Sequence, residues 1–215
     1  MTTSWLRGLA VFGATVTAAT TFANPALATS PPRPGMQVDA QNSRCTAGFA
    51  AQGNDGSYYL FTSGHCDAHD DSEWTYGNAV PLGRITASEH EGDTVDAAII
   101  HLDPSVGAPV GNVGGKYIVR DVLSPMQVER GMPFCKIGAV SGETCGVVQD
   151  VKNDVVLASV YSANGDSGSP GFVMNPDGTV SAVGLLMSSP DGDDNSTYFA
   201  SIQPLLGRWG LRVLP

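Results

Sequence analysis

The chain has 215 residues, of which 42% are hydrophobic and 15% are charged, which is enough for one domain with a substantial core and argues against long disorder. The 11 basic and 21 acidic residues give a formal charge of −10, which disfavours binding to nucleic acid or to anionic lipid. The 26 glycines and 14 prolines disfavour helical bundles and coiled coils and predict a turn-rich β protein.

The first 28 residues have the pattern of a secretory signal peptide. One cation, Arg7, precedes the apolar run 8–16, and small residues then lead to the A-x-A sequence at 26–28. A membrane anchor is the alternative, but the run is short for a bilayer span and is interrupted by threonine. We therefore expect cleavage after Ala28, secretion, and no membrane insertion after cleavage.

The segment 29–43 is predicted to be a proline-rich leader. Its prolines and Gly35 are unsuited to the interior of a sheet, so an extended linker is expected here. The folded domain is then predicted to occupy residues 44–215.

Short runs typical of β-strands follow, separated by turn-forming residues. The sequence at 175–179, Asn-Pro-Asp-Gly-Thr, is a strong hairpin signal, and a single short helix is predicted over 202–209. Many short strands with frequent turns are typical of antiparallel barrels or sandwiches. The strands are predicted at 46–51, 57–63, 80–87, 97–102, 116–123, 145–149, 155–160, 171–174 and 180–187.

All four cysteines follow the predicted cleavage site and would reach an oxidising compartment, so two disulfides are predicted. Four cysteines allow three pairings. Because shorter loops close at lower entropic cost, Cys45–Cys66 and Cys135–Cys145 are favoured. A zinc site is disfavoured, since no C-x2-C pair is present.

Three short motifs carry the residue types of nucleophilic catalysis. His65 stands at the end of a predicted strand, directly before a cysteine, and Ser167 lies in a glycine-flanked bend. Asp96 stands at the mouth of a predicted buried strand. Asp93 is a local rival, but we prefer Asp96 because the strand follows it at once.

The chemistry assigns each of these residues a role. A serine hydroxyl becomes a useful nucleophile when an imidazole accepts its proton, and a buried carboxylate orients that imidazole. We therefore predict Ser167 as nucleophile, His65 as base and Asp96 as its partner. The backbone amides of Gly165 and Ser167 are predicted to bind the oxygen that becomes negative during the reaction.

The motifs, in the order histidine, aspartate, serine, resemble the chymotrypsin-like serine proteases, in particular the bacterial branch of streptogrisins and α-lytic protease. The resemblance runs from 44–49 through the three motifs and the loop 135–145 to the tail 203–210, and so covers nearly all of the mature chain. It implies an all-β fold of two antiparallel six-stranded β-barrels with a short C-terminal helix and a cleft between the barrels.

The resemblance also implies an ion pair behind the nucleophile loop. In the bacterial branch, an arginine beside the first cysteine of the second bridge pairs with the aspartate before the nucleophile. Lys136 stands at that place here and is expected to pair with Asp166. Lysine is a point charge rather than a planar fork, so we expect a less fixed geometry.

A substrate pocket is implied as well. The position of Tyr161 carries no Asp or Glu that would attract a lysine or arginine side chain of the substrate. Small or apolar substrate side chains are therefore expected. Met187 or Ser188 falls where the family has a serine that supports the triad carboxylate, and Met187 there would remove a hydrogen-bond partner from Asp96. The implied pocket residues are Tyr161, Ser162, Asn164, Met187 and Ser188.

Other polar clusters are interpreted as solvated loops. His69 and the neighbouring acidic residues 67–71 imply no ligand geometry, and the segment 191–195 lacks the distant glutamate of a calcium-binding EF-hand. We expect no metal and no cofactor.

Taken together, the sequence predicts a secreted, monomeric serine endopeptidase that acts on protein or peptide substrates through an acyl-enzyme. Two alternatives stay open. One is a binding protein of the same fold with little or no proteolysis, which Met187 suggests, and the other is an esterase that uses the same residues.

Overall fold

The computed structural model describes residues 1, 2, 30–92 and 94–215. Residues 3–28 of the predicted signal peptide lie outside the described residues, and so does Asp93, the rival to Asp96. Within the described ranges, no helix is long and apolar enough to cross a membrane.

The described chain is nearly all β, with one α-helix. Its turns form where the sequence places polar residues and glycine, as in the hairpin at 175–179, where the Asn175 amide donates to the Thr179 carbonyl at 2.9 Å. The elements are β1 (Gln37–Ala40), β2 (Ser43–Thr46), β3 (Ala50–Gly53), β4 (Tyr58–Thr62), β5 (Trp74–Tyr76), β6 (Val80–Glu91), β7 (Val95–Leu102), β8 (Val119–Val122), β9 (Pro133–Gly138), β10 (Gly142–Lys152), β11 (Val155–Ala158), β12 (Pro170–Met174), β13 (Val180–Ser188), β14 (Thr197–Ser201), α1 (Gln203–Trp209) and β15 (Leu211–Val213).

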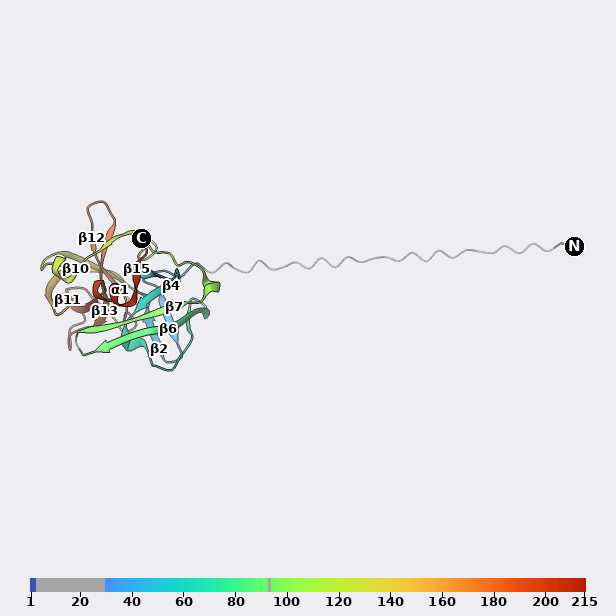
Figure 1. The fold of residues 1–215 in the computed structure, drawn as a ribbon, viewed down its shortest axis with the longest axis horizontal. Helices are drawn as coiled ribbons and strands as arrows, with labels where there is room; N and C mark the ends of the chain where they lie inside the picture. The colour runs from blue at the N-terminus through green and yellow to red at the C-terminus, as the bar shows by residue number, and fades with distance from the viewer. Residues whose placement is uncertain (3–29, 93) are drawn as a thin grey trace.

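The strands form two sheets, which lie side by side in Figure 1. The first has eight strands in the order β15-β3-β4-β7-β6-β5-β1-β2. The second has the order β12-β9-β10-β11-β14-β13-β8, and an additional pairing of β12 with β13 closes six of its seven strands into a barrel. The edge strand β8 pairs with β13 in parallel.

A shared hydrophobic core joins the two sheets. Phe49 and Phe61 from the first half belong to the same buried cluster as Phe172 and Leu185 from the second. Leu205 of α1 belongs to this cluster as well, and α1 lies near the middle of the folded part of the chain in Figure 1. Because both sheets bury side chains in one cluster, their relative position is determined by packing.

The predicted all-β class, a double barrel with a short C-terminal helix, is confirmed. The count of six strands holds for the second barrel, while the first sheet is a curled sheet of eight strands. Two short segments account for part of the difference, because β1 comes from the predicted leader and β15 comes from the chain's end.

The prediction that the leader 29–43 lies outside the sheets is wrong. β1 lies between β2 and β5, and Pro32 and Pro34 are buried. The physical reason is that proline has no backbone donor but keeps its acceptor: the carbonyls of Pro32 and Pro34 accept bonds from the amides of Val110 at 2.9 Å and Gly114 at 3.1 Å. The strand itself begins after the last proline, so the fold starts near residue 32 rather than 44.

Both predicted disulfides are present. Cys45 is bonded to Cys66, and Cys135 is bonded to Cys145. The second bridge joins directly opposite positions of β9 and β10.

The contribution of β1 can be tested by truncation. A chain that begins at Arg44 loses the buried Val38 side chain, worth about 1.5–3 kcal/mol, together with the β1 ladder. We expect it to unfold in urea with a free energy lower by at least about 3 kcal/mol than that of a chain that begins at Ser30. Equal free energies of unfolding for the two chains would show that residues 30–43 add no stability and act as a leader outside the folded domain.

Candidate active site

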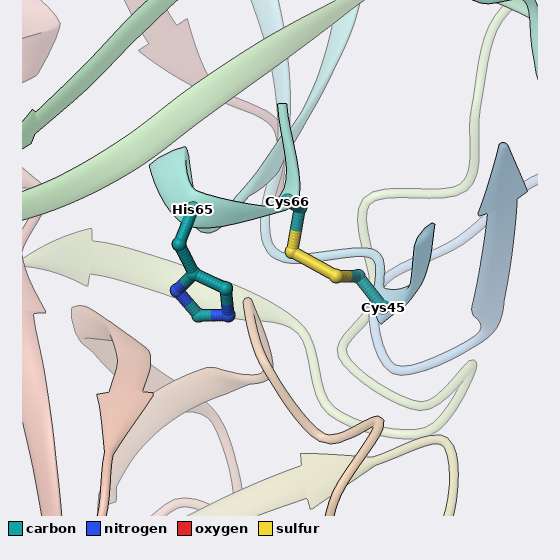
Figure 2. Close-up of side chains that lie close together, drawn as sticks. All are labelled: Cys45, His65 and Cys66. Carbon is teal, nitrogen blue, oxygen red and sulfur yellow. A yellow bond between two sulfur atoms is a disulfide. The ribbon is translucent and has the colours of Figure 1, made fainter. Parts of the chain in front are cut away.

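His65 lies on a short 3-10 turn, Gly64–Cys66, directly after β4. The disulfide from Cys66 to Cys45 anchors this turn, and the His65 ring extends from it in Figure 2. The residue before His65 must be glycine, because a Cβ on Gly64 would lie 2.2 Å from the Glu89 carbonyl oxygen. Glycine therefore lets the turn approach β6 closely.

Asp96 is the second residue of β7. β4 and β7 are antiparallel neighbours, and Thr62 lies opposite Ala98. The last residues of β4 and the first residues of β7 therefore lie side by side at the same end of the strand pair. The Asp96 side chain is buried, and it accepts hydrogen bonds from the His65 amide at 2.8 Å and from His65 Nδ1 at 2.7 Å. These two bonds fix the position and the orientation of the imidazole.

Ser167 comes from the second half of the molecule, in the loop that joins β11 to β12. Gly168 has a φ of +86°, and a Cβ there would lie 2.5 Å from both the Thr46 carbonyl oxygen and Thr62 Oγ1. Glycine thus allows the serine loop to lie directly against the first sheet. The Ser167 Oγ is 2.8 Å from His65 Nε2.

The three residues predicted from the motifs thus form one hydrogen-bonded chain across the two sheets. In the neutral imidazole that carries its proton on Nδ1, this nitrogen donates to Asp96 and Nε2 accepts from Ser167. Such a chain can activate a serine hydroxyl as a nucleophile.

The amides of Gly165 and Ser167, which the sequence analysis predicts to bind the oxyanion, differ from their neighbours in hydrogen bonding. Among the described residues, neither amide donates a hydrogen bond, whereas Asp166 N donates to Ala163 O and Gly168 N donates to Leu186 O, each at 2.9 Å. Two unpaired amides beside a serine hydroxyl are the donors that a developing oxyanion needs.

Asp166 and Lys136 form an ion pair of 2.9 Å in which both side chains are fully buried. The Asp166 carboxylate also accepts from Ser141 Oγ and from the amides of Val140, Ser141 and Ala163. Lys136 Nζ donates to Ser141 Oγ as well, so the lysine is held by more than one acceptor. This network fixes the loop that carries Ser167.

Burial shapes the ionisation of this pair. Burial lowers the pKa of Lys136, and the neighbouring carboxylate partly opposes that effect. Burial alone would raise the pKa of Asp166, but its hydrogen bonds from Ser141 and Lys136, and the lysine charge, hold that pKa below its ordinary value of 3.8.

The implied pocket residues differ in exposure. Ser162 is buried, and its Oγ lies 2.8 Å from Ser189 Oγ and 3.0 Å from Thr197 Oγ1. Tyr161 is 46% exposed, and Asn164 is exposed as well. Sequence analysis did not assign Ser189 or Thr197, because only the paired strands bring these hydroxyls to Ser162.

Met187 is buried and Ser188 is exposed. Within the described part of the chain, Asp96 accepts side-chain and backbone hydrogen bonds from His65 alone. Met187 lines a hollow of about 630 Å³ together with Thr94 and Tyr198, and this hollow is also lined by Asp150, Lys152, Asn153, Val155, Leu157, Ser188, Ser189, Pro190 and Asp191.

One group of three potential metal ligands is found among the described residues, Cys45, His65 and Cys66. Figure 2 shows that the two sulfurs are joined to each other. Neither cysteine therefore offers the thiolate that a metal ion would bind.

No protein-family model matches the chain. Two uncharacterized proteins of Mycobacterium tuberculosis, MT1863 of strain CDC 1551 and Rv1815 of strain H37Rv, are 29% and 30% identical over 194 residues, which cover 82% of this chain and 84% of each relative.

Several proteases of known structure have a similar fold. Thermobifida fusca protease A is 24% identical with a TM-score of 0.70 over 85% of this chain and 97% of that chain. Nocardiopsis protease is 24% identical with a TM-score of 0.68 over 85% and 98%. An α-lytic protease homolog, N4, is 26% identical with a TM-score of 0.65 over 84% and 97%.

The fold and these similarities define a class of protein: the chain has the chymotrypsin-like serine protease fold, and the solved structures that resemble it are of the streptogrisin and α-lytic protease type. Its similarity to Rv1815 also groups it with that mycobacterial protein.

The buried ion pair predicts a pH-dependent effect of Lys136→Met. Because the pKa of Asp166 is lowered, its charge stabilises the folded state above about pH 4, and this contribution is lost as the pH falls through the lowered pKa. Leaving the Asp166 carboxylate without its cation should cost about 3–5 kcal/mol in urea unfolding at pH 7, and the difference from the parent should shrink at pH 3.

The matched control is Lys116→Met. Lys116 pairs with Glu143 at 3.1 Å, but its side chain is 60% exposed, so its loss should cost less than about 1 kcal/mol. Equal losses in the two variants would contradict the role of the buried pair.

Proposed function

We propose that the protein is an exported serine endopeptidase that hydrolyses peptide bonds with Ser167 as nucleophile, His65 as general base and Asp96 as its partner. The observation that carries the proposal is the hydrogen-bond chain, with 2.8 Å between Ser167 Oγ and His65 Nε2 and 2.7 Å between His65 Nδ1 and Asp96 Oδ2. The serine-protease fold supports a protease-type function.

In this mechanism, Ser167 Oγ attacks the carbonyl carbon of the scissile peptide bond while its proton passes to His65 Nε2. Asp96 stabilises the imidazolium that forms. The negative oxygen of the tetrahedral intermediate accepts hydrogen bonds from the amides of Gly165 and Ser167. The intermediate then collapses, and the departing amine takes the proton from His65.

The product of this first stage is an ester between the substrate's acyl group and Ser167. A water molecule gives a proton to His65 and attacks the ester, and the second intermediate releases the carboxylic acid and restores the serine. His65 passes the proton from water to Ser167 Oγ as the acid leaves, so the neutral imidazole and the serine hydroxyl are both restored, and the original serine proton leaves with the amine.

Export is part of the proposal. It is supported by the predicted signal peptide at 1–28 and by the two disulfides, which persist in oxidising compartments. We propose that the exported protein is a monomer that acts on proteins or peptides.

A second candidate function is partner binding without appreciable proteolysis. It is favoured by Met187, which offers no hydroxyl, and by the absence, among the described residues, of any donor to Asp96 besides His65. An imidazole whose carboxylate has fewer hydrogen bonds is a weaker catalyst.

A fluorophosphonate probe discriminates the two functions. Only an activated serine reacts readily, so we expect labelling of the purified protein on Ser167 and complete loss in Ser167→Ala. His65→Ala should slow labelling by about 10³-fold or more. A folded protein that resists the probe would support the binding function, and paired ester and peptide substrates would separate an esterase from a protease.

The contact between Ser162 and Ser189 predicts the size of the preferred substrate side chain. The resemblance implies that these segments are the pocket walls, and their hydroxyl oxygens are only 2.8 Å apart. A planar ring between two walls needs about 7 Å, since each van der Waals contact takes about 3.5 Å. We therefore expect cleavage after glycine, alanine or serine rather than after aromatic residues.

Peptide-library cleavage followed by mass spectrometry measures this preference. The double variant Ser162→Gly/Ser189→Gly should widen the accepted range toward leucine and phenylalanine, whereas Ser72→Gly, in an exterior loop, should leave the profile unchanged. Preferred cleavage after phenylalanine by the parent would show that the walls do not restrict the site.

A further inference from the structure

Thr46 is a fully buried polar residue that the proposed mechanism does not use. It ends β2 in the first sheet, directly after the disulfide-bonded Cys45. Its backbone and side-chain polar groups contact segments on which the proposed reaction depends.

Two of these contacts reach the nucleophile loop. The Thr46 amide donates to the carbonyl of Ser167 at 2.8 Å. The Thr46 hydroxyl donates to the carbonyl of Gly165 at 2.9 Å, across 119 positions of sequence. Both residues that are proposed to bind the oxyanion are therefore held by Thr46 through their carbonyl groups.

Two further contacts extend the network. The Thr46 hydroxyl accepts from the Ala139 amide at 3.1 Å, in the loop whose next two amides donate to Asp166. The Thr46 carbonyl accepts from Thr62 Oγ1 at 3.0 Å, three positions before His65. One residue thus joins the histidine segment, the nucleophile loop and the ion-pair loop.

The Gly165 peptide groups need such an anchor. Gly165 has a φ of +100°, a conformation in which a glycine backbone can rotate at little steric cost. Among the described residues, the Gly165 carbonyl accepts one hydrogen bond, and its donor is Thr46 Oγ1. That carbonyl shares its peptide group with the Asp166 amide, which donates to the Ala163 carbonyl, so the Thr46 bond fixes the other side of the peptide that lies between the two proposed oxyanion donors.

We infer that Thr46 is a positioning residue for the oxyanion-binding amides, acting through a hydroxyl that both donates to Gly165 and accepts from Ala139. The catalytic part of this inference rests on the proposed function. An oxyanion donor acts in the transition state, so its misplacement should lower kcat more than it raises KM.

The substitution that removes only the hydroxyl is Thr46→Val. Valine has nearly the same shape but can neither donate nor accept, so it leaves the Gly165 carbonyl and the Ala139 amide without partners. Thr46→Ser keeps the hydroxyl and is the rescue variant. Thr75→Val is the matched control, because the Thr75 hydroxyl donates to the Asp39 carbonyl, between β5 and β1.

The first readout is the reaction of Ser167. We expect Thr46→Val to lower kcat for a peptide substrate, and the rate constant for fluorophosphonate labelling, by about tenfold or more, with KM changed less than about threefold. Thr46→Ser should recover most of the rate, and Thr75→Val should react like the parent. Unchanged rates in Thr46→Val, or an equal loss in Thr46→Ser, would overturn the inference.

The second readout does not require activity. Hydrogen–deuterium exchange of segments 138–141 and 163–168 should be faster in Thr46→Val than in the parent, and not in Thr46→Ser or Thr75→Val. Unchanged exchange in Thr46→Val would overturn the positioning role. A parent protein that resists the probe would instead contradict the proposed function, while exchange would still decide whether Thr46 holds the loop.

Discussion

The hydrogen bond of 2.8 Å between His65 Nε2 and Ser167 Oγ crosses from one sheet to the other. A hydroxyl and an imidazole interact well only over a few tenths of an ångström, so the two sheets must be held together with that accuracy. The shared hydrophobic cluster supplies the general position. Direct bonds such as Thr46 N to Ser167 O, and the close contact at Gly168, supply the fine position.

The segment before the nucleophile is stabilised by polar groups rather than by apolar packing. A fully buried carboxylate and a fully buried ammonium are costly to remove from water, and their attraction repays the cost only when other hydrogen bonds complete the site. The amides of Val140, Ser141 and Ala163 provide that completion for Asp166. The resulting rigidity is what a preorganised anion site needs, because donors that are already oriented do not have to reorganise during the reaction.

Two groups of side chains near the candidate site differ in polarity. Met187 is buried beside a large hollow, where it adds apolar surface but no hydrogen bond to Asp96. Ser162, Ser189 and Thr197 form a chain of hydroxyl contacts in which each group has a partner. Ser189 belongs to both features, because its hydroxyl contacts Ser162 and its side chain lines the same hollow as Met187.

The sequence by itself determined the β class, the two disulfides and the identity of the three residues that meet at the site, because motifs, loop-closure entropy and alternation are local properties. The sequence did not predict short strands such as β5, β9 and the strand in the predicted leader. A run of three to six residues carries little periodic signal. Only the tertiary structure decided that Thr46 meets Gly165, that Ser162 meets Ser189 and that Pro32 is buried, since each contact depends on strand register and on packing between segments far apart in the chain.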